Sequence, residues 1–376
     1  MTKRGGVALL CGGVLFILSL ALESRLYRFF GVLVLMAAGY ALLSCLWGAL
    51  TLQAGCDAQE NKLCRGETLP LHFCAAHRSI LPLGDIHLEG YAGEQGFSLQ
   101  IENHEGCSVS YEAGHVGIVR AGISRVYISD LFGFFRLGKK HFPALSFLVL
   151  PPLHPIEATC LQKGQEGDAS QSRAQEDYTS PEDVRAYQPG DALKRVHWKL
   201  YARRHEMLVR RYETPTPPET LILCDFADPS GVVPDEQIPF VRDWLCERAL
   251  SCAGAQLSAQ SPVRLPFYGS KAGEFAARDA ENLPLLQEML ARQPFDRPTS
   301  FSAVLGMEMR NLRKAGAIII ITHRLDAAIA DGICALRASG PNVRLYLLKK
   351  GEDQALSPLL SSLHGQMVEV KYESLP

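Results

Sequence analysis

Two long apolar runs near the amino terminus limit what this chain can fold into more than any other feature. The runs, residues 5–22 and 29–50, contain no charged residue. As helices they would measure about 27 and about 33 Å, close to the roughly 30 Å hydrocarbon core of a bilayer. A cleaved signal peptide would account for the first run only. The short polar segment 23–28 between them therefore predicts a transmembrane helical hairpin over residues 1–50.

Cations beside the two runs predict the orientation of this hairpin. Four basic residues flank its outer ends, against two in the connecting segment: Lys3, Arg4, Lys62 and Arg65, against Arg25 and Arg28. Positive charge is enriched on the cytoplasmic side of membrane helices. We therefore expect a two-pass protein of the cell membrane whose termini and soluble domains are cytoplasmic.

The cysteine content agrees with a cytoplasmic location, and the net charge gives the whole chain no attraction to nucleic acid. The chain has 11 Cys, without a C-x-x-C pair, and the spacing of Cys56, Cys64 and Cys74 is too wide for a zinc knuckle. We expect free thiols, as in a reducing compartment. The 38 basic and 40 acidic residues give a net charge of -2, so only a local basic patch could attract nucleic acid.

Residues 51–155 change to short segments of alternating polarity. The segments, separated by turn residues, are 69–73, 96–102, 107–114, 117–129 and 145–151. This pattern predicts an antiparallel, sandwich-like β domain. Its histidines lie on different segments without a ligand-like spacing, so we expect surface or half-buried side chains and no metal site: His72, His77, His87, His104 and His115. Residues 156–180 follow as a linker, because 162–177 lack an aliphatic core.

After residue 218 the pattern alternates between strand and helix. Expected strands cover 220–227, 263–269, 317–322 and, as the last element, 342–351, and expected helices cover 235–256, 281–292, 300–316 and 324–340. This order predicts a doubly wound α/β sheet. Such sheets bind ligands beyond the carboxyl ends of their strands. The segments to inspect for a site are therefore 225–230 and 322–326.

The stretch YQPGDALKRVHWKLYARR, residues 187–204, combines a turn, a tryptophan and many cations. Asp191 is suited to cap a helix on which Arg195, Lys199 and Arg203 share a face. One interpretation is a phosphate track along 194–211. The other, which we favour, is a structural clamp in which Trp198 is packed and Arg195 and Arg203 pair with carboxylates. Acidic residues just upstream support the clamp: Glu176, Asp177, Glu182 and Asp183.

The same stretch resembles domain of unknown function family 58. The matching positions are Tyr187, Pro189, Gly190, Asp191, Arg195, Trp198, Lys199, Ala202 and Arg203, and the segment DLFGFFRLGKK at 130–140 is also similar to that family. The resemblance implies a bacterial membrane protein with a von Willebrand factor type A-like domain within 181–376. It also implies a MoxR-type AAA+ ATPase as partner, and a transglutaminase-like membrane protein as a second one.

The resemblance further implies a divalent cation bound by Asp-x-Ser-x-Ser after the first strand. This chain has Asp225, but Ala227 and Pro229 stand at the hydroxyl positions, and His323 stands where a later Asp is expected. A hard cation needs several oxygen ligands. Only Asp228 and Ser230 could assist Asp225, so we expect a degenerate site and no cofactor. Mg²⁺ bound by these three residues is the alternative.

No catalytic signature is present. The chain lacks a G-x-S-x-G elbow, a Walker loop, an H-E-x-x-H helix and a Gly-rich dinucleotide turn, and His197 with Asp191 has no nucleophile. We therefore expect a non-enzymatic, membrane-anchored interaction or scaffold protein that works with a MoxR-type AAA+ ATPase in a cell-envelope or complex-assembly process. The alternatives are a hydrolase-like catalytic member of an envelope complex and a weak nucleic-acid binder.

Overall fold

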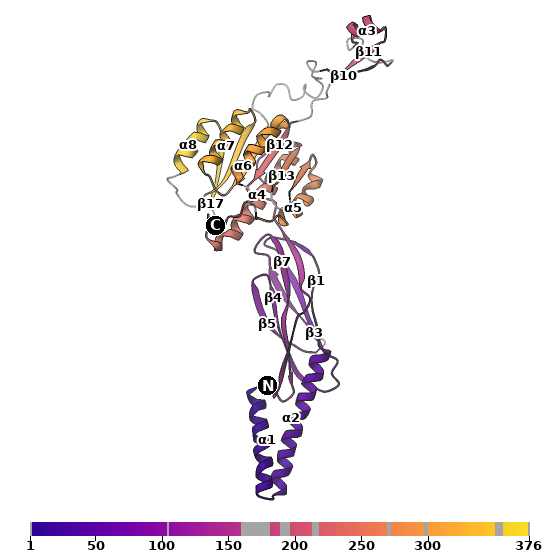
Figure 1. The fold of residues 1–376 in the computed structure, drawn as a ribbon, viewed down its shortest axis with the longest axis vertical. Helices are drawn as coiled ribbons and strands as arrows, with labels where there is room; N and C mark the ends of the chain where they lie inside the picture. Colours follow the sequence, from indigo (N-terminus) through magenta and orange to yellow (C-terminus); the bar gives the residue numbers. More distant parts are fainter. Residues whose placement is uncertain are drawn as a thin grey trace. The chain divides into compact units, whose positions relative to one another are not determined.

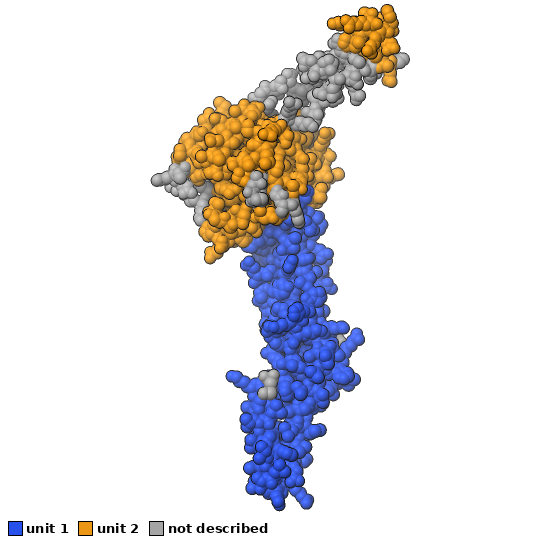
Figure 2. Space-filling model, viewed as in Figure 1, with its two compact units in different colours: residues 1–152, 287–292 blue, residues 153–286, 293–376 orange. Residues whose placement is uncertain are grey.

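The computed structural model describes eight ranges of the chain and divides it into two compact units. The described residues are 2–103, 105–158, 181–188, 196–212, 218–268, 272–296, 300–349 and 356–374. Unit 1 comprises residues 1–152 and 287–292, and unit 2 comprises 153–286 and 293–376 (Figure 2). The expected linker at 156–180 lies almost entirely outside the described residues.

Unit 1 begins with two apolar helices that pack side by side (Figure 1): α1 (Lys3–Ala21) and α2 (Arg25–Thr51). Both are long and apolar enough to cross a membrane, as the sequence predicted. The helices differ in length, with 19 residues in α1 and 27 in α2. The residue after α2, Leu52, is buried in the core of the following β domain, so no linker separates helix and domain.

The β domain of unit 1 has two sheets around one core, which confirms the expected sandwich-like fold. The smaller sheet has the order β1-β3-β6, and the larger has the order β2-β9-β7-β4-β5 with β8 paired to β7. Side chains from both sheets meet in this core, among them Phe73 and Tyr111 of the first sheet and Leu88 and Phe147 of the second. The strands are β1 (Gln53–Ala58), β2 (Lys62–Cys64), β3 (Thr68–Ala76), β4 (Leu83–Ala92), β5 (Gln95–Ile101), β6 (Gly106–Glu112), β7 (Gly117–Asp130), β8 (Arg136–Lys140) and β9 (Leu145–Leu150).

Unit 2 contains a six-stranded sheet of order β14-β13-β12-β15-β16-β17, parallel except for β14. Its strands are β12 (Glu219–Cys224), β13 (Val263–Phe267), β14 (Gly273–Ala277), β15 (Ala315–Thr322), β16 (Asn342–Lys349) and β17 (Glu369–Ser374). Its helices are η2 (Asp235–Gln237), α4 (Ile238–Ser258), η3 (Ala280–Asn282), α5 (Leu283–Ala291), α6 (Phe301–Glu308), η4 (Met309–Lys314), α7 (Ala327–Ala338) and α8 (Ser357–Gly365).

Successive residues of a strand point to opposite sides of the sheet, so a sheet with apolar residues on both sides needs cover on both. Helices cover both faces of this sheet. Leu221 and Leu223 share a core with α6, α7 and α8. On the other face, the Cys224 thiol lies 3.8 Å from the Leu245 carbonyl oxygen of α4. The expected doubly wound, mixed α/β arrangement is therefore present.

Three details of the expected α/β order were wrong. The sheet has an antiparallel edge strand, β14, and it continues beyond β16 through α8 to β17, whereas the sequence suggested that the strand at 342–351 was the last. The helix expected over 300–316 ends its α-helical part at Glu308, passes through η4 and yields to β15 at Ala315. The polar, charged pattern of β14 and β17 has little apolar signal, which is typical of edge strands.

Candidate functional site

The carboxyl ends of β12 and β15 lie side by side at the centre of the unit 2 sheet. Cys224 pairs with Ile321 in the parallel ladder, and the Asp225 amide donates to the Ile321 carbonyl oxygen at 2.9 Å. From β12 the chain first builds β13 and β14 on one side and then β15 to β17 on the other. This change of direction is the place where doubly wound sheets bind ligands. The two segments that the sequence singled out, 225–230 and 322–326, both begin here.

Asp225 is fully buried at this point, and both of its carboxylate oxygens are engaged. Oδ1 accepts a hydrogen bond from the Ala227 amide at 3.2 Å, and Oδ2 lies 3.1 Å from the Thr322 hydroxyl. Arg324 donates from Nε to Oδ2 at 2.9 Å and approaches Oδ1 with Nη2 at 3.4 Å. A buried carboxylate needs such compensation, because its desolvation is costly.

Local backbone geometry aims Arg324 at Asp225. The Thr322 hydroxyl accepts a hydrogen bond from the Arg324 amide at 3.2 Å and lies 2.9 Å from the Arg324 carbonyl oxygen. The chain thus turns back directly after β15. The Arg324 side chain keeps 26% of its surface exposed, so the guanidinium joins the buried carboxylate to the molecular surface.

His323 lies between these two residues in sequence, and its side chain has no accessible surface. Its Nδ1 is 3.8 Å from Asp225 Oδ2, too far for a hydrogen bond, and among the described residues neither ring nitrogen has a hydrogen-bond partner. Burial lowers the pKa of His323; the Asp225 carboxylate opposes this effect and the Arg324 guanidinium adds to it. The imidazole is therefore neutral at neutral pH.

The residue after Asp225 belongs to a cluster of aromatic side chains. Phe226, the next residue, is buried, stacks on Phe267 at 5.4 Å between ring centroids and meets Phe295 edge-on at 5.7 Å. Arg242 lies over the Phe295 ring at 5.3 Å. The segment that carries Asp225 is therefore fixed by packing on its aromatic neighbour as well as by the hydrogen bonds of the carboxylate.

The other two candidate cation ligands, Asp228 and Ser230, lie at the surface, whereas Asp225 is buried. Asp228 and Ser230 are exposed, and Asp228 Oδ1 accepts from the Ser230 amide at 3.1 Å and lies 3.7 Å from Arg242 Nη2. The hydrogen bond with Ser230 is the main cause of a lowered Asp228 pKa. Within the described ranges, no three His, Cys, Asp or Glu side chains are arranged to hold a metal ion.

The donor set at Asp225 does not fit a divalent cation. The position beside the carboxylate is filled by a guanidinium, which already supplies positive charge, and the nearest additional side chains offer one hydroxyl and one imidazole. Mg²⁺ prefers several oxygen ligands in octahedral geometry. The role of Arg324 was not predicted from the sequence. A usable signal was its position two residues after β15, the strand that pairs with β12 next to Asp225.

The signature stretch forms a small module of its own in unit 2. Strands β10 (Pro181–Ala186) and β11 (Leu208–Tyr212) pair in antiparallel fashion, and the helix α3 (Trp198–Arg204) precedes β11. Strand β11 lies in residues 207–213, MLVRRYE, where the sequence alternates in polarity. Four signature residues lie outside the described residues: Pro189, Gly190, Asp191 and Arg195.

The start of the module's helix was predicted wrongly. It begins at Trp198, and His197 caps it by accepting from the Leu200 amide at 3.3 Å, so Asp191 is not its cap. Val196 forms an antiparallel bridge with Val209, so this residue is not part of the helix. Lys199 and Arg203 lie on α3, whereas Arg195 precedes it.

Trp198 is on the surface of this module. Trp198 is 54% exposed, and among the described residues its ring meets that of Tyr201, edge-on at 6.0 Å, while Val196 and Val209 are buried. Tyr187 is half-buried, and Lys199, Ala202 and Arg203 are exposed. Within the described residues, the packed Trp198 and the paired Arg203 of the clamp interpretation are not found.

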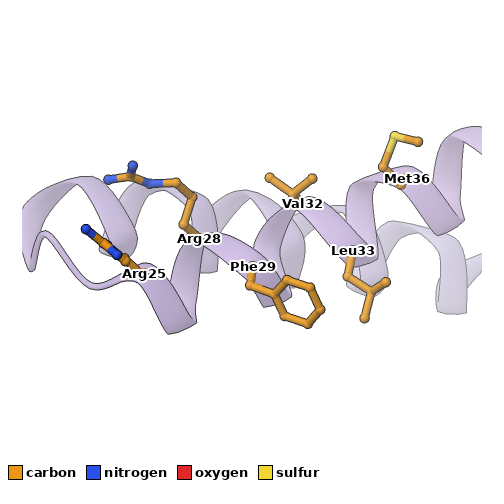
Figure 3. A pocket seen from close by; sticks show the side chains of 6 residues that line it. All are labelled: Arg25, Arg28, Phe29, Val32, Leu33 and Met36. Atoms are coloured by element: carbon orange, nitrogen blue, oxygen red, sulfur yellow. The ribbon is translucent and has the colours of Figure 1, made fainter.

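An open hollow on α2 is a second feature with polar and apolar parts (Figure 3). Its lining residues all come from the first turns of that helix: Arg25, Arg28, Phe29, Val32, Leu33 and Met36. The two guanidinium groups lie at the end where the helix begins, and the apolar side chains follow along its axis (Figure 3). Cations at the end of an apolar helix are typical of a membrane boundary.

Comparisons with known proteins give a family model and solved structures of low sequence identity. The search of curated proteins found no match. The PKD domain of an M14-like peptidase from a Thermoplasmatales archaeon is 13% identical, with a TM-score of 0.19, over 26% of this chain and 91% of that one. Cwp6 from Clostridium difficile is 9% identical, with a TM-score of 0.17, over 86% of this chain and 49% of that one.

The family model described as "Protein of unknown function DUF58" matches residues 183–356. The match begins within β10, covers α3 and β11, and extends through the central sheet to the far side of β16. It therefore includes both the signature module and the Asp225–Arg324 pair. Residues 183–356 of the chain belong to the DUF58 family.

Proposed function

We propose that this protein is a non-enzymatic, membrane-anchored interaction protein that works with a MoxR-type AAA+ ATPase in a cell-envelope or complex-assembly process. In this proposal α1 and α2 span the cell membrane, and both termini and the soluble domains are cytoplasmic. A transglutaminase-like membrane protein is a further partner. Family resemblance suggests the partners, and the structure supplies a surface for them.

The observation that carries the proposal is the exposed face of α3. The helix exposes a tryptophan and a tyrosine one turn apart, Trp198 and Tyr201, and an arginine, Arg203, on another side. These are the three residue types most enriched among the residues that dominate binding energy at protein interfaces. A tryptophan that is half exposed on a short helix gains little for folding, whereas a partner could bury it.

The central sheet supports a non-enzymatic role. At its switch point the carboxylate of Asp225 is bonded to Arg324, and His323 is buried and neutral. A general base needs an accessible proton acceptor near a nucleophile, and His323 is not accessible. We assign the sheet to the von Willebrand factor type A-like class on its strand order together with the family resemblance, and we assign the Asp225–Arg324 pair a structural role that replaces the cation.

The proposal is tested by crosslinking the intact protein in its native membrane and recovering it with its partners. The wild type and Met307→Ala, which truncates an exposed side chain on α6, should recover a MoxR-type ATPase. Trp198→Ala should lose most of it, because an interface tryptophan typically contributes 2 kcal/mol or more, about a thirtyfold change in affinity. Equal recovery by all three proteins would show that α3 is not the docking face.

The alternative functions give different outcomes with the purified full-length protein. A hydrolase-like protein would turn over substrate in an activity screen, and Asp225→Asn would abolish that turnover. A nucleic-acid binder would bind DNA with a steep dependence on salt concentration, since phosphate contacts release counterions. Either result, without recovery of an ATPase, would overturn the proposal.

A further inference from the structure

The turn between β7 and β8 leaves two large apolar side chains exposed. Leu131 is 59% exposed and Phe132 is 46% exposed, and the Phe132 ring stacks on Phe134 at 5.5 Å. Both residues belong to the segment DLFGFF, one of the two that suggested the family. Neither the sandwich core nor the Asp225 site uses them.

Hydrogen bonds hold this turn in one conformation. The buried Asp130 carboxylate accepts from the Phe132 amide at 2.9 Å and from the Phe135 amide at 2.6 Å. Gly133 has a φ of +69°, a value that glycine adopts readily, and its amide donates to the Asp130 carbonyl oxygen at 3.1 Å. Leu131 and Phe132 are thus presented outward by a fixed scaffold.

The same turn is tied to the beginning of α1. The Thr2 amide donates to the Phe134 carbonyl oxygen at 3.0 Å, and the Thr2 hydroxyl lies 2.6 Å from the Gly133 carbonyl oxygen. A Cβ on Gly5 would lie 2.1 Å from the Phe134 carbonyl oxygen, so only glycine permits this approach. On the other side Phe135 is buried against Ala41 and Cys45 of α2.

Helix lengths place the turn at the level of a membrane surface. The 19 residues of α1 span about 28 Å, the thickness of a hydrocarbon core. Arg25 and Arg28 mark the end of the hairpin that is distant from the turn (Figure 3), and Lys3 and Arg4 mark the end beside it. Lys3 and Arg4 are exposed, and within the described ranges no carboxylate pairs with them. The longer α2 continues past this level into the β domain.

From these relationships we propose that the turn 131–134 is a membrane-interface anchor whose Leu131 and Phe132 side chains insert between lipid headgroups and acyl chains. Aromatic and apolar side chains held at that depth gain from burial in the interface. The partner of this surface is the phospholipid bilayer itself. The inference rests on the proposed membrane anchoring, because it needs α1 and α2 to span the same bilayer.

The experiment uses the full-length protein in phospholipid vesicles and tryptophan as a probe. Phe132→Trp places the probe on the turn. Ile118→Trp places it on an equally exposed apolar position at the opposite end of β7, and Phe30→Trp places it within α2. Fluorescence is measured as the difference from the wild type, with acyl-brominated lipid as the membrane quencher and iodide as the aqueous one.

We expect the probe at 132 to be blue-shifted, quenched by brominated lipid and protected from iodide, as the probe at 30 is. The probe at 118 should show the opposite behaviour. If the probe at 132 behaves like the probe at 118 while the probe at 30 is quenched by lipid, the turn does not insert into the membrane, and the proposal that the hairpin spans the bilayer is kept. If 30 is not quenched by lipid, the hairpin does not span the bilayer and both proposals fail. Leu131→Trp replaces Phe132→Trp if the latter does not fold.

Discussion

Arg324 donates from Nε to Oδ2 of Asp225 at 2.9 Å, at the point where the central sheet of unit 2 changes direction. In this arrangement the positive charge beside the carboxylate belongs to the polypeptide itself. The pair therefore cannot be removed by a chelator, and it does not depend on the supply of a metal ion.

Millimolar Mg²⁺ should leave the melting temperature of the wild-type protein nearly unchanged. A ligand stabilises a fold only when it binds the native state, and Arg324 fills the position beside Asp225 that a cation would take. Thermal unfolding with and without Mg²⁺ measures this effect. A rise of several degrees that disappears in Asp225→Ala would show that Asp228 or Ser230 completes a cation site.

Arg324→Ala should lower the free energy of unfolding of unit 2 by about 3 kcal/mol, because it leaves a buried carboxylate without its cation. Arg310→Ala is the matched control, since Arg310 is exposed on η4 and its loss should cost less than about 0.5 kcal/mol. Hydrogen exchange of β12 and β15 amides reports the change. Asp225→Asn combined with Arg324→Ala should cost less than the sum of the single changes, since the two residues interact directly.

Buried His323 should make unit 2 less stable in mild acid. Its pKa in the folded protein lies below the value of 6.5 for a free side chain, chiefly through burial. The unfolded chain therefore binds more protons between the two pKa values. The stabilising contribution is fully present above about pH 6.5 and is lost as the pH falls toward the folded-state pKa. Thermal unfolding from pH 7.5 to 5 should show this slope for the wild type and for His364→Gln, an exposed control, and a smaller slope for His323→Gln.

Trp198→Ala and Arg203→Ala should each change the stability of the signature module by less than about 0.5 kcal/mol, because both side chains are exposed. Val209→Ala, which truncates a buried side chain of the same module, should cost about 1 to 2 kcal/mol. Hydrogen exchange of the backbone amides of residues 208–212 measures the change in stability of each variant. Destabilisation by several kcal/mol in Trp198→Ala would restore the clamp interpretation.

Reporter fusions test the orientation of the hairpin. Fusions after Leu50 and at the carboxyl terminus should be active only with a cytoplasmic reporter, while an insertion between Glu23 and Arg28 should be active only with an external one. Reversing the charge balance with Lys3→Glu and Arg4→Glu should reduce the fraction in this orientation. Activity of an external reporter after Leu50 in the wild type would contradict the assigned topology.

The parts of the fold that carry a strong apolar pattern could be predicted from the sequence. The runs that became α1 and α2 and the buried strands β12 and β15 were found within a few residues, because few polar residues interrupt these segments. Strands β14 and β17 were missed, since each contains charged residues and lies at an edge of the sheet. Local pattern carries little information about such strands.

The candidate site, too, could be predicted only in part from the sequence. Asp225 and Thr322 could be placed together, because parallel strands end at the same edge of a sheet. The direction of the Arg324 side chain depends on the turn that Thr322 holds, and no periodic pattern records it. The exposure of Trp198 could not be predicted either, because the same residue type serves cores and interfaces alike.

The missing linker after α2 has a mechanical consequence. Leu52 joins the helix to β1 and is buried in the sandwich core, while Cys45 and Ala41 pack on Phe135 about two and about three turns earlier. The helix and the sandwich are thus fastened at two separated points along one axis. A force that tilts or rotates α2 must tilt or rotate the β domain by the same angle, so the helix and the β domain move together as one rigid body.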